Sequence, residues 1–402
     1  MQFRLIPSRC GVLLAMLLLA QPQGFAAESS SGNPMQSVTA VRSRLATATE
    51  EYRRKLEEYT AARQEYEDDT RAYWSSIADK RRARIAKRRS GQTLSIDDYV
   101  LTQPPTYSGP PKPVDPSAPA GEQPPSYEKY VPVVEDFLRS AEEEFQFVPQ
   151  RPQSEIEYKR AYATVASTAG LTKEQIVRIY GFESGGDGKY DVQAGLEHPT
   201  PGARAISTAL GYNQLLATNS VELLAEKGDR FVEILQTKAE GVTGEAREAL
   251  KKKILVLKAM VDFSRTVPDD WSEHEKLANT PKGLGIHALN LDIDIGPLLQ
   301  TQKLLDSVVF FRSQGYAAVL TAAELEMMNL TGDGNGIEII TMPSEWRDHV
   351  PTSNFFQKGG YERNPIAIRN NVVSKLLVAT DAVMDKEIEL QGAKDLAWLI
   401  SN

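Results

Sequence analysis

Apolar residues near the start of the chain recur every seven positions, a spacing that places them along one side of a helix. The stretch from 34 to 89 is rich in Ala, Glu, Arg and Lys and has no Gly or Pro after its first residue. The pattern predicts one long helix within a coiled-coil-like region at 34–95. We expect its apolar side either to pair with a second copy of the chain or to dock on an envelope partner. The repeating residues are Val38, Leu45, Tyr52, Tyr59, Tyr66 and Tyr73.

The last turns of this predicted helix are strongly basic, because seven of the ten residues at 80–89 are Lys or Arg. Two interpretations stay open for them. The segment is either a solvated helix end or a surface that contacts an anionic envelope polymer or membrane.

The rest of the chain divides at a proline-rich segment. Residues 103–132 hold ten of the 23 prolines, which favour extended backbone, so this segment is predicted to be a linker. From 133 to 402 the apolar positions follow helical spacing and strand-like alternation is scarce, which predicts an all-α fold with one α-rich domain at 133–402. A long loop region is expected at 341–365. The expected helices cover residues 134–146, 155–168, 173–184, 212–225, 229–238, 244–263, 292–313, 321–329, 366–386 and 391–400.

Composition and charge narrow the class of protein. With 402 residues, 41% of them hydrophobic, the chain can bury a sizeable core, and its net charge of −8 argues against bulk nucleic-acid binding. A short apolar run follows two arginines and precedes a small-residue site, which predicts a cleaved signal peptide at 1–26. The run is too short to cross a bilayer, and no transmembrane segment is expected in the mature chain. The protein is therefore expected to be periplasmic or secreted.

The inventory of reactive groups excludes most catalytic chemistries. The one cysteine, Cys10, lies in the predicted signal peptide, so we expect neither disulfides nor thiol nucleophiles in the mature protein. The four histidines have no paired helical spacing, which argues against a zinc site. A segment starting at Asp333 begins like a calcium loop but carries Glu338 where a glycine is required. No metal and no cofactor are predicted.

One carboxylate is placed unusually, on the apolar side of a predicted helix. Thr172 and Gln175 form a capping-box pattern at the start of that helix, which ends before two glycines. Glu183 follows Ile179 by four positions and Tyr180 by three, so it points toward the face that those residues bury. Burial and the helix C-terminus both predict a raised pKa for Glu183, as a general acid requires. The alternative is a helix-end glutamate whose carboxylate turns to water.

Four short segments stand in order between about residues 160 and 335. They are Glu183-Ser184-Gly185-Gly186, Gly211-Tyr212-Asn213-Gln214-Leu215-Leu216, Asn290 to Gly296, and Ala322-Ala323 leading to Met328-Asn329-Leu330-Thr331-Gly332. In kind and order they resemble the motifs of soluble-type lytic transglycosylases, a family of the lysozyme-like superfamily.

This resemblance implies a lysozyme-like helical fold and cleavage of peptidoglycan glycan strands. Glu183 would protonate the glycosidic oxygen between N-acetylmuramic acid and N-acetylglucosamine, and would then take a proton from the C6 hydroxyl as a 1,6-anhydro ring closes. The resemblance implies glycan binding for Ser184, Tyr212, Asn213, Gln214 and Asn329.

The chain departs from the family pattern in the second and fourth motifs. Asn213 replaces a methionine, and Met328 stands where an active-site tyrosine is expected, for which Tyr361 is the candidate replacement. A second acid would instead allow lysozyme-type hydrolysis, with candidates at Asp187, Asp191 and Asp333.

Two functions are carried forward from these motifs. One is an exported lytic transglycosylase. The other is a non-catalytic peptidoglycan-binding or envelope scaffold protein with a degenerate lysozyme-like fold.

Overall fold

A computed structural model describes residues 34–116, 130–197 and 200–401. Over these ranges the protein is all-α, as predicted, and the strand-like contacts are three isolated bridges: Gln193 with Leu210, Leu210 with Leu215, and Pro351 with Val372. None of the described helices is both long and apolar enough to cross a membrane. The predicted signal peptide at 1–26 and residues 117–129 of the predicted linker lie outside the described ranges.

The helices divide between two compact units, one containing described residues up to 63 with 109–116 and the other containing 64–108 and 130–401. Helix α1 (Pro34–Arg89) has residues in both. The other helices belong to the second unit: η1 (Ile96–Asp98), α2 (Val134–Phe145), α3 (Glu155–Thr168), α4 (Lys173–Ser184), α5 (Ala217–Glu240), α6 (Gly244–Ser264), α7 (Trp271–Ala278), α8 (Pro281–His287), η2 (Ala288–Leu291), α9 (Gly296–Ser313), α10 (Ala322–Thr331), α11 (Asp333–Thr341), α12 (Ser344–Arg347), η3 (Thr352–Phe355), α13 (Lys358–Glu362), α14 (Pro365–Arg369), α15 (Val373–Glu387) and α16 (Gln391–Ser401).

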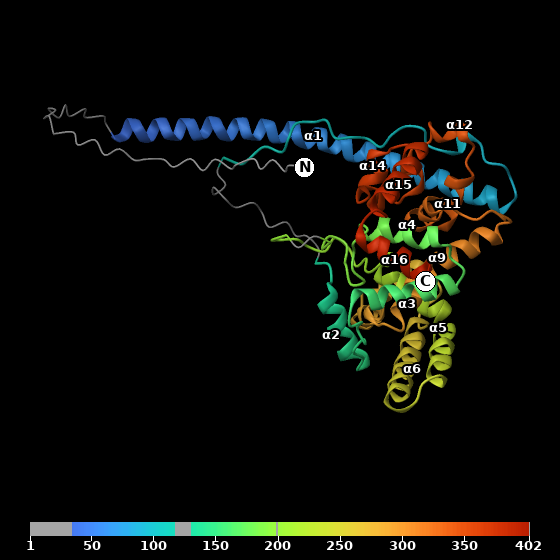
Figure 1. Ribbon diagram of the computed structural model, residues 1–402. Coiled ribbons are helices and arrows are strands. Elements are labelled where there is room, and N and C mark those ends of the chain that lie inside the picture. The colour runs from blue at the N-terminus through green and yellow to red at the C-terminus, as the bar shows by residue number, and fades with distance from the viewer. Residues whose placement is uncertain (1–33, 117–129, 198–199, 402) are drawn as a thin grey trace, which may run out of the picture. The chain divides into compact units, whose positions relative to one another are not determined.

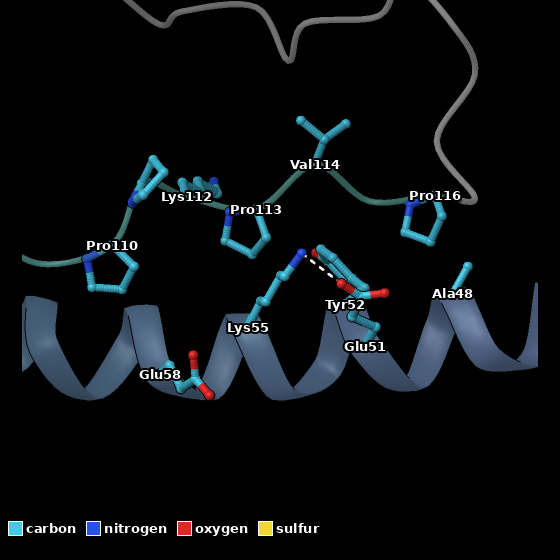
Figure 2. Close-up of a pocket in the computed structure, with 11 residues that line it drawn as sticks. Ala48, Glu51, Tyr52, Lys55, Glu58, Pro110, Lys112, Pro113, Val114 and Pro116 are labelled. Carbon is cyan, nitrogen blue, oxygen red and sulfur yellow. Dashed lines mark ion pairs between the residues drawn. The ribbon is translucent and has the colours of Figure 1, made fainter.

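The tyrosine side of α1 is covered by the chain's own proline-rich segment. In the first unit, Pro110, Pro113 and Pro116 lie along the helix, with Pro113 over Tyr52 and Lys55 (Figure 2). Extended proline-rich backbone packs well on aromatic side chains because it has few donors left to satisfy. This part of the predicted linker is therefore packed on a helix.

The same arrangement is found separately within the second unit. There the rings of Tyr66 and Tyr107 meet edge to face with centroids 5.5 Å apart. Trp74 faces the segment 103–106 across a small pocket. Tyr52, Tyr66 and Tyr73 of the repeating residues thus face other parts of the same chain.

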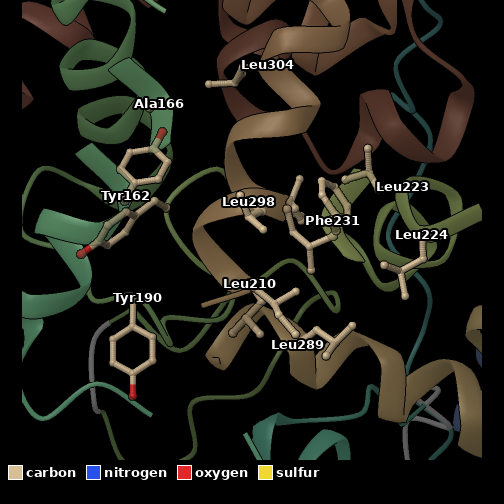
Figure 3. Packing of buried hydrophobic residues seen from close by; sticks show 14 of the residues in the cluster. Tyr162, Ala166, Tyr190, Leu210, Leu223, Leu224, Phe231, Leu289, Leu298 and Leu304 are labelled. Atoms are coloured by element: carbon tan, nitrogen blue, oxygen red, sulfur yellow. The ribbon is translucent and has the colours of Figure 1, made fainter. Parts of the chain in front are cut away.

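The main hydrophobic core of the second unit is built where α3, α4, α5, α8 and α9 meet, with α5 and α6 running as an antiparallel pair (Figure 1). Figure 3 shows part of this core, with Ala166 of α3, Phe231 of α5 and Leu298 of α9 in one buried cluster. Close packing of α5 on α6 needs a glycine at 228, because a Cβ there would lie 2.3 Å from a methyl carbon of Val261.

A second apolar cluster joins the end of α1 to the C-terminal helices, and the burial of Arg84 beside it corrects the expectation of a fully solvated helix end. Arg84 is fully buried and donates to Glu338 at 2.8 Å, and its guanidinium lies 4.5 Å from the ring centre of Tyr99. Arg81 donates to the backbone carbonyl of Phe356 at 2.6 Å. Much of the basic segment therefore anchors α1 inside its own fold.

The expected long loop at 341–365 is also corrected by this cluster. The segment forms the short helices α12, η3 and α13, and Phe355 and Tyr361 of these elements are buried in the cluster. The side chain of Asn354 holds the segment to Val100, donating to its carbonyl at 2.8 Å and accepting from its amide at 2.9 Å.

Candidate active site

Glu183 lies in the last turn of α4, and both ends of that helix are fixed by its own sequence. At the start, the Thr172 hydroxyl accepts from the amide of Gln175 at 3.1 Å, and the Gln175 side chain accepts from the amide of Thr172 at 2.9 Å. At the end, Gly185 and Gly186 adopt positive φ angles of 65° and 71°. This left-handed turn stops the helix directly after Glu183 and Ser184.

Glu183 is one of the residues that line a cleft of about 1010 Å³. The volume is at the upper end of the range for small-molecule sites. The cleft is bounded by the end of α4, the loop that follows it, the end of α15, the start of α2 and Arg151. Its charged lining residues are Glu135, Arg151, Glu183, Asp187, Lys189, Asp191, Glu197, Lys386 and Glu387.

Two side chains from α10 hold the Glu183 carboxyl. Asn329 donates from Nδ2 to Oε1 of Glu183 at 2.7 Å. The same Nδ2 lies 3.5 Å from Oε1 of Glu326, so Asn329 places the carboxyls of Glu183 and Glu326 beside each other. Burial raises the pKa of Glu183 above its usual value, while the hydrogen bonds from Glu326 and Asn329 act in the opposite direction. The direction agrees with the raised pKa expected from the sequence.

Sequence reasoning missed Glu326, which is fully buried. Burial is the largest cause that raises its pKa well above the usual range, and the neighbouring Glu183 carboxylate adds to it. A signal was present in the sequence. Glu326 is surrounded by Leu325, Met327 and Met328, so it occurs inside an apolar run and stands three positions before Asn329.

The second motif forms a buried turn, where a helix beginning at 212 was expected. Tyr212 is fully buried, and its ring packs edge to face on those of Tyr158, Tyr162 and Tyr180. Tyr212 is therefore not accessible to a glycan in this structure, which corrects the glycan contact expected of it.

Asn213 is also corrected, because its amide is used inside the fold. It donates to the backbone carbonyl of Gln300 at 2.7 Å and to the hydroxyl of Tyr162 at 3.0 Å, and only 1% of the residue is exposed. Gln214 is partly buried, and its amide donates to the carbonyl of Val192, a residue of the cleft, at 3.2 Å. Of Tyr212, Asn213 and Gln214, only Gln214 hydrogen-bonds to a residue that lines the cleft.

The remaining predicted residues, Ser184 and Tyr361, line different pockets. Ser184 lines the cleft, but its hydroxyl donates to the carbonyl of Tyr180 at 2.6 Å and so closes the helix end. Tyr361 does not replace the tyrosine of the motif. It is buried in the second cluster, its ring centre 5.6 Å from that of Trp74, and it lines a different pocket.

The three candidate second acids do not all lie at the same site. Asp187 and Asp191 line the same cleft as Glu183. Asp187 accepts from the amide of Gly392 at 2.6 Å, and Asp191 forms an ion pair with Arg151. Asp333 instead accepts from the hydroxyl of Ser307 at 2.6 Å, which makes it a structural residue at the start of α11.

Metal chemistry has no candidate among the side chains that the structure describes, since no three His, Cys, Asp or Glu residues are grouped as ligands. In comparisons with known proteins, the chain matches no family model, no curated protein and no solved structure. The group that the site offers for chemistry is the carboxyl of Glu183, whose pKa burial raises, at a residue that lines a polar cleft.

Proposed function

We propose that this protein is an exported lytic transglycosylase that cleaves peptidoglycan between N-acetylmuramic acid and N-acetylglucosamine. The observation that carries the proposal is the position of Glu183, a carboxyl with a raised pKa that is held by Asn329 on the wall of a large cleft. The four motifs that resemble this enzyme family supply the substrate class.

The proposed reaction uses one carboxyl twice. Protonated Glu183 gives its proton to the glycosidic oxygen as the bond from that oxygen to C1 of the muramic acid breaks. The resulting carboxylate takes the proton of the C6 hydroxyl while the C6 oxygen bonds to C1 and closes the 1,6-anhydro ring. Asn329 donates to Oε1 of Glu183 and so fixes the orientation of the carboxyl through both steps. No water enters the bond balance.

The second candidate function is a non-catalytic peptidoglycan-binding protein. The observation that favours it is Met328, which stands in the place of the motif's tyrosine and is fully buried, so the hydroxyl expected beside the acid is missing. The buried side chains of Tyr212 and Asn213 point the same way, because they remove two of the expected glycan contacts.

Digestion of purified sacculi distinguishes the two functions. The wild-type protein is expected to release soluble muropeptides with 1,6-anhydro ends, measured by mass spectrometry, and Glu183→Gln to release none because an amide cannot donate an acidic proton. The control is Glu143→Gln, a matched change of an exposed glutamate on α2. Reducing ends would assign a hydrolase, and binding to sacculi without release by the wild-type protein would favour the non-catalytic candidate.

A further inference from the structure

The carboxyl of Glu326 has few hydrogen-bond donors near it. The residue is fully buried on α10, and Asn329 Nδ2 lies 3.5 Å from its Oε1, a marginal hydrogen bond. The other oxygen, Oε2, is buried and has no conventional donor facing it among the described side chains. A buried carboxylate with so few donors is strongly disfavoured, whereas a protonated carboxyl needs an acceptor. The neighbouring carboxylate of Glu183 is that acceptor.

Two adjacent carboxyl groups in one buried site cannot both be ionised, so the pair must hold a proton. Glu326 is fully buried, while Glu183 is partly exposed and is one of the residues that line the cleft. Once the pair has given up one proton, the charge is therefore better tolerated on Glu183, and the remaining proton belongs on Glu326.

We propose that Glu326 is a positioning residue for the acid: it donates its carboxyl proton in a hydrogen bond to Glu183 and so orients that group toward the cleft. This inference rests on the proposed function, since it assigns Glu326 a part in the same reaction. Glu326 stands two positions before Met328 in α10, and it supplies the hydroxyl donor that Met328 cannot supply.

The role of Glu326 can be followed through the proposed reaction. Glu183 loses its proton to the glycosidic oxygen and becomes a carboxylate, and the O–H of Glu326 then donates to it. When Glu183 takes the C6 proton, the pair returns to its starting state, and Glu326 has neither gained nor lost a proton. The hydrogen bond is stronger to the ionised form of Glu183, so it stabilises the intermediate state.

The surroundings of the pair hold this geometry. The backbone at Met328 packs closely against α11, since a Cβ on Gly336 would lie 2.4 Å from the Cα of Met328. The other charged groups on this side of the cleft are Lys386 and Glu387 from the end of α15, and Asp187 and Lys189 from the loop after α4. Glu387 forms an ion pair with Lys386. Their charges are unchanged in the variants below.

The test compares two substitutions in the full-length protein. Glu326→Met keeps the volume but removes the donor, and Glu326→Gln keeps a donor that cannot ionise. We expect Glu326→Met to lower kcat/KM on sacculi about 10- to 100-fold, the effect of losing one hydrogen bond to a charged group. It should also move the alkaline limb of the pH profile upward, because Glu183 loses a donor that stabilised its ionised form. Glu326→Gln should recover most of the rate and restore the limb. Circular dichroism checks that each variant is folded.

The results that would overturn the inference differ from those that would overturn the proposed function. If Glu326→Met keeps the wild-type rate and pH profile, or if Glu326→Gln is as impaired as Glu326→Met, Glu326 does not act as a donor. If wild-type protein cleaves no glycan, the proposed function fails. Infrared spectra at neutral pH then decide the pairing independently of activity. A protonated-carboxyl band lost in Glu326→Gln supports it, and a spectrum that this change leaves unaltered contradicts it.

Discussion

Replacing Arg84 by Met should destabilise the second unit strongly, although the residue lies in a segment that looks like a solvated basic surface. Arg84 is fully buried, and it donates to Glu338 at 2.8 Å, to the carbonyl of Asp98 at 3.1 Å and to that of Asn354 at 3.2 Å. Removing one partner of a buried ion pair typically costs about 3–5 kcal/mol, because the other charge is left uncompensated. Arg88 also pairs with Glu338, so we expect the lower end of that range.

The assay is urea unfolding followed by tryptophan fluorescence, because Trp74 and Trp346 pack against the same cluster. The control is Arg82→Met, whose side chain is exposed and pairs only with Asp79 on the surface, and which should lose at most about 1 kcal/mol. The double variant Arg84→Met, Glu338→Leu should recover much of the loss, because an apolar pair of similar volume leaves no buried charge. A loss for Arg84→Met no larger than that of the control would refute the buried pair.

Three further outcomes are expected. Gly186→Ala should unfold at a lower temperature than Gly185→Ala. Both positions have a left-handed backbone, which costs a non-glycine residue about 1–2 kcal/mol, but only at 186 would a Cβ lie 2.3 Å from the carbonyl oxygen of Glu387. Equal decreases in unfolding temperature would contradict this packing. His287 is fully buried, and burial lowers its pKa from 6.5 to about 4. As pH falls, the unfolded chain therefore binds the proton first, and the free energy of unfolding should drop by about 3 kcal/mol between pH 6.5 and pH 4. Denaturation of His287→Gln over the same pH range should not show this drop. Tyr361→Phe should cleave sacculi at the wild-type rate, and a loss above tenfold would return Tyr361 to the active site.

The fold class and several helices follow from the sequence alone. The periodicity and end signals predict α3 and α4 with the bounds that the structure shows. The two helices expected at 212–225 and 229–238 are one helix, α5, because Gly228 serves close packing on α6 and does not end the helix. Residues 212–216 are excluded from it because they form a turn in which Leu210 and Leu215 exchange backbone hydrogen bonds.

The candidate site was predicted in part, and its missing partner has a physical explanation. Helical spacing indicates which face Glu183 occupies, and the fold class follows from the same kind of pattern. Spacing within one helix cannot show which residues of another helix face it, so the contacts of Glu326 and Asn329 depend on the packing of α10 on α4. Tyr212 was misassigned for a related reason, since a tyrosine suits a sugar platform and a ring cluster equally well in sequence.

The side-chain charge of Glu183 as a function of pH tests the central claim most directly. Carbon-13 NMR of protein labelled at glutamate carboxyl carbons, with the signal assigned by its loss in Glu183→Gln, follows that charge without substrate. The account predicts a titration midpoint clearly above those of exposed glutamates such as Glu143, because burial raises the pKa of Glu183. A midpoint that coincides with those of the exposed glutamates would contradict it.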